Sequence, residues 1–124
     1  MQNRFMTVSA AALGLKIGSM ADIPELIGAA YSLDGLIVTE ADLGPELFRL
    51  SSGVAAELFQ KLVNLRLPAA LVLRDFSAYG ERFAELASEH ARHPYVRFVH
   101  SEDEARRWLE TRLWTALFRP LSPD

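Results

Sequence analysis

The sequence predicts a single-domain α/β protein, in which a mixed, mostly parallel sheet of about five strands carries helices packed on it. Short apolar runs alternate along the chain with segments whose apolar residues recur at helical spacing. The 124 residues suit one domain, and a 50% share of hydrophobic residues is enough to bury a core. The expected order is β-β-α-β-α-β-α-β-α over a core of residues 5–118, with a C-terminal tail of residues 119–124.

The composition narrows the class of protein. The 13 basic and 16 acidic side chains give a net charge of -3, which disfavours a nucleic-acid binder. No apolar run reaches the roughly 20 residues that span a bilayer. The absence of cysteine excludes disulfides and fits a cytoplasmic protein. An alternative stays open for residues 5–15, because Arg4 precedes an Ala-rich apolar run of the kind found in signal peptides.

The N-terminal elements are expected to form a hairpin. Met6 alternates with Val8, and Leu13, Leu15 and Ile17 alternate further on. Alternation of this kind predicts half-buried strands, here joined by an Ala/Ser turn. Because a short turn joins antiparallel neighbours, this hairpin would make the sheet mixed.

The first helix is expected to begin near Asp22, because Glu25 three residues later gives the spacing of a capping box. Pro24 suits the first turn, and Gly35 marks the end. Its apolar positions are Ile23, Leu26, Ile27, Ala30 and Tyr31. The apolar run 36–38 then predicts a strand buried on both faces.

The later elements repeat this alternation of helices and apolar runs. They are a helix opened by Ser51, Ser52 and Gly53, a buried strand over 69–73, a helix ended by Pro94, a strand over 95–99 and a last helix opened by Ser101 with Glu104.

Four short stretches resemble the domain of unknown function 4180 family. They are residues 55–64 (AAELFQKLVN), residues 75–79 (DFSAY), Glu89 and the pair at 98–99. The similarity spans roughly residues 13 to 110. That family is small, bacterial and of unassigned activity, so the resemblance implies a fold more than a function.

Residues 36–72 more loosely resemble the middle of STAS domains, the anti-sigma-factor antagonists. In STAS domains the second serine of an Asp-Ser-Ser-Gly motif at a helix start accepts a phosphate. Here the stretch reads Leu50-Ser51-Ser52-Gly53, so the resemblance implies Ser52 as the phosphate acceptor, with Leu50 in place of the Asp. STAS domains bind protein partners without catalysis, which implies a non-catalytic interaction module without a cofactor.

Polar side chains follow each predicted parallel strand. The carboxyl ends of parallel strands meet at one edge, where α/β proteins bind ligands. We therefore expect a binding rim made of Glu40, Asp42, Ser51, Ser52, Gly53, Arg74 and Asp75, with His100 and Ser101 beside it.

Two functions of this rim stay open. The favoured one is protein binding through the Ser52 helix start and the adjoining loops. The alternative is a small-molecule binder or enzyme, in which Glu40 and Asp75 are acid/base groups and Arg74 clamps an anion. For Asp75 itself, the favoured interpretation is an Asx turn with the backbone near Ser77.

Three further groups are interpreted conservatively. Glu89, His90 and His93 have a metal-like spacing, but a core or helix-end role is favoured and no metal site is expected. The arginines of the last helix are interpreted as a solvated face. They are Arg106, Arg107 and Arg112. Extra apolar bulk near the C-terminus suggests either a homo-oligomer contact or packing on the sheet edge. It comprises Trp114, Phe118 and Leu121.

Overall fold

The structure is a computed structural model that describes residues 7–117, with side chains described for residues 7–112. Four parallel strands form one sheet in the order β1-β2-β3-β4, so the neighbours in space are also neighbours in the chain. The strands are β1 (Thr7–Ser9), β2 (Gly35–Thr39), β3 (Ala69–Val72) and β4 (Val96–Val99). The helices are α1 (Asp22–Ala30), α2 (Pro45–Phe48), α3 (Val54–Leu65), α4 (Glu81–Glu89) and α5 (Glu102–Leu117).

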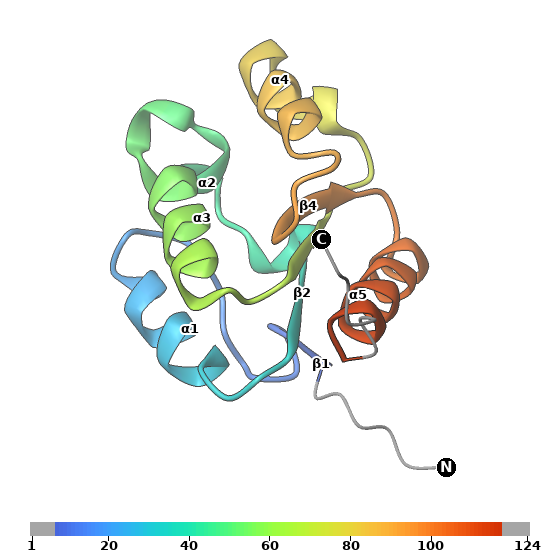
Figure 1. The fold of residues 1–124 in the computed structure, drawn as a ribbon. Coiled ribbons are helices and arrows are strands. Elements are labelled where there is room, and N and C mark those ends of the chain that lie inside the picture. The colour runs from blue at the N-terminus through green and yellow to red at the C-terminus, as the bar shows by residue number, and fades with distance from the viewer. Residues whose placement is uncertain (1–6, 118–124) are drawn as a thin grey trace.

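Helices cover both faces of the sheet (Figure 1). When strands are added in one direction, right-handed crossovers place every connecting helix on the same face. Accordingly Leu36 and Val38 of β2 pack in one core with residues of α1, α3 and α4. Ile37 points to the opposite face, where it packs with Ala105 and Leu109 of α5. The predicted α/β class with buried central strands is therefore confirmed.

The predicted N-terminal hairpin is wrong. Among residues 7–117 the sheet has four strands rather than about five, and it is entirely parallel rather than mixed. β1 pairs with β2 in parallel register, Thr7 opposite Gly35. Leu13 lies in a turn, with its N–H donating to the backbone oxygens of Ser9 and Ala10. Ile17 then pairs with Leu43 in an isolated parallel bridge instead of returning along β1. Alternating burial specifies which side chains face the core, but it does not specify the strand on which the backbone pairs.

This bridge brings two chain segments into close contact. The Ile17 N–H donates to the backbone oxygen of Asp42 at 2.8 Å, and the Gly44 N–H donates to the backbone oxygen of Ile17 at 2.9 Å. A Cβ atom at Gly44 would lie 2.9 Å from the Cα atom of Gly18. Glycine at position 44 is therefore needed for the backbones to approach.

The two predicted capping boxes differ in outcome. At α5 the Glu104 N–H donates to Ser101 Oγ, and the Glu104 carboxylate accepts from the His100 N–H. At α1 the Asp22 carboxylate instead accepts from the N–H groups of Gly18 and Ser19, which precede the helix. The spacing therefore identified both helix starts. Only the bond from the Glu104 N–H to Ser101 follows the predicted pattern, because the Glu104 carboxylate accepts from the residue before Ser101.

One side chain of the predicted helix stripe is exposed, and the lengths of the helices bear on whether the chain could cross a membrane. The sequence pattern places Tyr31 on the apolar stripe of the first helix, whereas in the structure Tyr31 follows the last turn of α1 and is 76% exposed. Among residues 7–117, no helix has the length and apolar character needed to cross a bilayer.

Candidate functional site

The carboxyl ends of β2, β3 and β4 converge as the parallel arrangement requires. Glu40 follows β2 directly, and its Oε1 accepts a hydrogen bond from the backbone N–H of Arg74 at 3.2 Å. The Nδ1 atom of His100, which follows β4, lies 3.2 Å from the backbone oxygen of Arg74. The structure thus brings the expected rim residues Glu40 and Arg74 together with the adjoining His100, while their part in binding stays a prediction.

Glu40 acts as a clamp between chain segments. Its second carboxylate oxygen accepts a hydrogen bond from the hydroxyl of Tyr79, which lies 39 positions further along the chain. The Tyr79 ring is stacked on Phe48 of α2, with ring centres 3.7 Å apart and an angle of 6° between planes. Both oxygens of Glu40 are therefore occupied by donors of the chain itself, which limits its use as a general base.

Asp75 forms the Asx turn that was one of its two expected roles. Its Oδ1 accepts from the hydroxyl of Ser77 at 2.7 Å and from the Ser77 N–H at 3.0 Å. These bonds, first from the hydroxyl and then from the N–H, lower the pKa of Asp75, and the charge of His100 adds to the effect. A carboxylate with a lowered pKa is a weak base, so this geometry favours a turn-forming role.

Arg74 and His100 are both exposed to solvent at the rim, as Asp75 is. Within residues 7–112, the Arg74 guanidinium has no ion pair or hydrogen bond. The His100 ring is stacked on Phe76, with ring centres 4.2 Å apart and planes inclined by 16°. Arg74, whose guanidinium has no partner among these residues, thus lies beside the stacked rings of Phe76 and His100.

Asp42, expected at the binding rim, is turned into the fold and only 5% exposed. Its Oδ2 accepts from both the N–H and the hydroxyl of Thr39, each at 2.9 Å. It thereby closes the short 3-10 turn Glu40–Asp42 that follows β2. The sequence separation of three residues between Thr39 and Asp42 is the only local signal for this role.

The helix expected to open at residues 51–53 begins at Val54, after the 3-10 turn Leu50–Ser52. Gly53 caps it with a φ of 81°, a left-handed conformation that glycine adopts without strain. The Ser52 hydroxyl donates to the backbone oxygen of Glu46 at 2.6 Å and accepts from the Val54 N–H at 3.2 Å. Ser52 is therefore a turn-fixing residue that is partly buried, whereas Ser51 is exposed.

An apolar groove, which the sequence did not reveal, opens between α1 and α3 with a volume of about 470 Å³. Its lining residues are Met20, Ile23, Pro24, Ile27, Gly28, Glu57 and Lys61. Met20 is 44% exposed, and its methyl carbon would lie 3.6 Å from a Cβ atom at Gly53. The groove therefore reaches the turn that carries Ser52. Ile27 in the expected apolar stripe was the available signal, but helical spacing alone does not show that its side chain is only half-buried.

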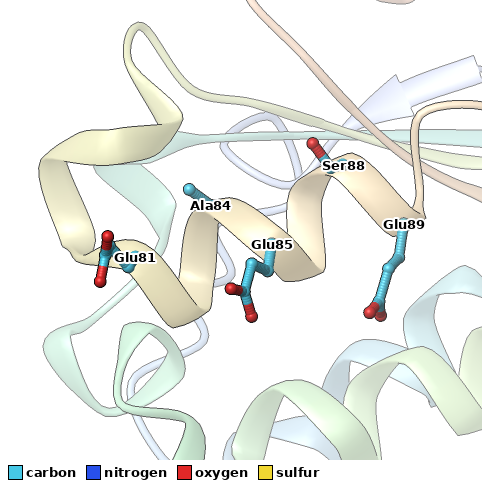
Figure 2. Close-up of a pocket in the computed structure, with 5 residues that line it drawn as sticks. All are labelled: Glu81, Ala84, Glu85, Ser88 and Glu89. Carbon is cyan, nitrogen blue, oxygen red and sulfur yellow. The ribbon is translucent and has the colours of Figure 1, made fainter.

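A second hollow, of about 480 Å³, lies along α4. Figure 2 shows Glu81, Glu85 and Glu89 spaced along this helix, with the small residues Ala84 and Ser88 between them. The glutamates repeat every fourth residue, opposite the buried Phe83 and Ala87. The hollow is the acidic outer face of an amphipathic helix.

The histidines of the metal-like motif make contacts within the fold. His93 Nδ1 accepts from the N–H groups of Tyr95 and Val96 at 3.0 and 3.2 Å. The His90 ring packs 5.0 Å from Phe59. In the part of the chain that the structure describes, no three His, Asp or Glu side chains are placed to hold a metal ion. The C-terminal contact expected from Phe118 and Leu121 lies outside the described residues, as does the side chain of Trp114.

The fold and rim define a small parallel α/β domain. Residues 3–109 match the family described as Domain of unknown function (DUF4180), and the chain belongs to that family. No curated protein and no solved structure is detectably similar to it. The comparisons lend no support to the looser resemblance to STAS domains.

Proposed function

We propose that this protein is a non-catalytic interaction module that binds a protein partner through the Ser52 turn and the adjoining α1–α3 groove. The observation that carries the proposal is the apolar groove beside this turn. Concave apolar surface next to an ordered polar turn is typical of sites that receive an apolar segment of another protein.

The groove suits a partner with apolar side chains. Helix α1 contributes Ile23, Pro24 and Ile27 to its lining, and Met20 lies close to Gly53, next to Ser52. Methionine adapts its flexible, polarisable side chain to different apolar partners. The opposite wall carries Glu57 and Lys61, whose charged groups are 3.6 Å apart and so neutralise each other. A neutral apolar segment is therefore the occupant that fits without leaving an unpaired charge.

The hydrogen bonds at the rim also favour binding over acid/base catalysis. Glu40 is occupied by Arg74 and Tyr79, and Asp75 is held by Ser77. A small-molecule binder remains the second candidate because the guanidinium of Arg74 has no partner within residues 7–112 and can receive an anion.

The test uses a photoreactive amino acid placed at position 20 and, as a matched control, at position 29, because Ala29 is an exposed α1 residue outside the groove. In cells of the source organism, we expect a protein to cross-link from position 20 and not from position 29. The Met20→Glu variant should retain about tenfold less of that protein than the wild type, whereas Ala29→Glu should retain the same amount.

Two results would contradict the proposal: equal cross-linking from both positions, or unchanged retention by Met20→Glu. A Ser52→Asp variant tests the turn in the same assay. The Ser52 hydroxyl donates to the backbone oxygen of Glu46, and a carboxylate at position 52 has no proton to donate. We therefore expect the Ser52→Asp variant to retain less of the partner. Thermal unfolding of each variant shows whether the domain is still folded.

A further inference from the structure

Cationic side chains gather where the chain passes from α4 into β4, on the edge of the sheet opposite the rim. His90, Arg92 and His93 come from the turn, Arg97 comes from β4, and Arg112 comes from α5. The protein as a whole carries a net charge of -3, so this local excess of positive charge is not a consequence of composition.

Arg97 is held in a fixed position by two contacts. Its Nε donates to the backbone oxygen of His93 at 2.9 Å. Its guanidinium carbon lies 4.9 Å from the ring centre of Trp108 in α5. Stacking on an aromatic ring orders the guanidinium plane while leaving its edge open.

Arg112 repeats this arrangement from the neighbouring helix. Its Nε donates to the backbone oxygen of Pro94 at 2.7 Å, and its guanidinium carbon lies 4.9 Å from the ring centre of Tyr95. In both arginines the Nε atom is directed to a carbonyl group of the 93–94 turn. Within residues 7–112 the terminal amino groups of both guanidinium ions have no hydrogen-bond or ion-pair partner.

The surroundings of these groups contain positive rather than negative charge. Burial lowers the pKa of Arg97, and the charges of Arg112 and Arg92 lower it further. Burial is also the main cause that lowers the pKa of His93, and the charges of His90 and Arg97 lower this pKa further. No carboxylate contributes to either shift, and the ion pairs of the described residues involve Arg49, Lys61 and Arg106 instead. Among the residues whose side chains the structure describes, the charges that act on Arg97 and His93 are thus positive.

We propose that Arg97 and Arg112 form a binding site for a phosphate monoester, with Arg92 adding long-range attraction. A guanidinium group with free terminal amino groups binds phosphate through two parallel hydrogen bonds. A phosphate monoester carries close to two negative charges at neutral pH and so matches two fixed guanidinium ions better than a single carboxylate does. Because both arginines are already ordered by Trp108 and Tyr95, binding costs little side-chain entropy.

The test titrates the full chain separately with inorganic phosphate, with a phosphoserine peptide and with a single-stranded oligonucleotide. Binding is followed by the NMR signals of the arginine side-chain N–H groups. We expect saturable shifts of the Arg97 and Arg112 signals. The variants Arg97→Lys and Arg112→Lys keep the charge but lose the two-pronged geometry, so each should bind about tenfold more weakly. Arg106→Lys is the matched control, because Arg106 is exposed on α5 and paired with Glu102.

The outcomes separate the alternatives. Binding that is about tenfold weaker in both variants and unchanged in the control supports the site, and tighter binding of the peptide than of inorganic phosphate identifies a phosphorylated protein as its source. Shifts that never saturate would refute it, as would equal weakening by Arg106→Lys. Tighter binding of a single-stranded oligonucleotide than of either phosphate probe would replace the monoester by a nucleic-acid backbone and overturn the assignment.

Discussion

The Glu40–Tyr79 contact is the most informative place to perturb the rim, because it separates a structural clamp from a free catalytic carboxylate. Tyr79→Phe removes one hydroxyl and keeps the stacking on Phe48. Hydrogen bonds to a charged group contribute about 1.5–3 kcal/mol each, and the half-buried position places this one at the lower end. We therefore expect Tyr79→Phe to lower the free energy of unfolding by about 1.5 kcal/mol.

Glu40→Ala should cost about 2–3 kcal/mol, because it removes the bond to Tyr79 and also the bond to the Arg74 N–H. If the contact is direct, the double variant should cost about 1 kcal/mol less than the sum of the two single variants. A carboxylate kept free for catalysis would behave differently, since removing such a group commonly leaves stability unchanged or raises it.

The measurement is urea unfolding of the four proteins of the cycle, with the slope of the free energy against urea concentration checked for constancy. Tyr31→Phe is the matched control, because Tyr31 is 76% exposed and its loss of a hydroxyl should change stability by less than about 0.5 kcal/mol. A coupling energy below about 0.3 kcal/mol would show that Glu40 and Tyr79 act independently and would refute the clamp.

Two further predictions concern the turn before β4 and the bridge at Gly44. The folded state lowers the pKa of His93 below its usual value of 6.5, so its contribution to stability is complete above that pH and is lost as the pH falls below it towards the folded-state pKa. His93→Asn, which keeps an acceptor for the turn, should flatten this part of the pH–stability curve; an unchanged curve would assign the dependence to other groups. Gly44→Ala should destabilise the protein by about 1–3 kcal/mol, because its Cβ atom would meet the Gly18 backbone. Gly28→Ala, in helix α1 with nothing within 4 Å, should stabilise it by about 0.5–1 kcal/mol, and equal thermal shifts of the two variants would contradict this reasoning.

The central strands could be predicted because their apolar runs report burial on two faces. Leu36 faces the α1–α3–α4 side and Ile37 faces α5, so neither position tolerates a polar residue in a two-faced sheet. Residues 13–17 could not be assigned in the same way. Leu13 and Leu15 are half-buried and Ile17 is fully buried, as alternation suggests, but the pairing of Ile17 with Leu43 joins positions 26 residues apart. Hydrophobic pattern carries no information on such a partner.

At the rim, too, one feature could be predicted from the sequence and another could not. That Glu40 and Arg74 lie close together follows from the parallel strands alone. That the Glu40 carboxylate is occupied by Tyr79 depends on the turn Phe76–Tyr79, which directs the ring onto α2. The prediction for Arg112 is wrong for a different reason. The sequence groups Arg112 with Arg106 and Arg107 on a solvated face, whereas its side chain reaches the backbone of Pro94. Helical spacing places a residue on a face, but a long side chain can cross to a neighbouring element.

The strand order also constrains where a small ligand could bind. Crevices in open α/β sheets form where successive connections leave on opposite faces, because the loops there diverge. From β1 to β4 the order never reverses, so the connecting helices α1, α3 and α4 share one face and leave no such crevice between their strands. Within residues 7–117 the chain changes face after β4, where α5 crosses to the other side. This change occurs at His100 and Ser101, beside Arg74 rather than beside Ser52. A small-molecule ligand, if the protein has one at this edge, should therefore contact Arg74 and His100, whereas a partner in the α1–α3 groove should leave both untouched, and the two modes of binding are separable by Arg74→Ala alone.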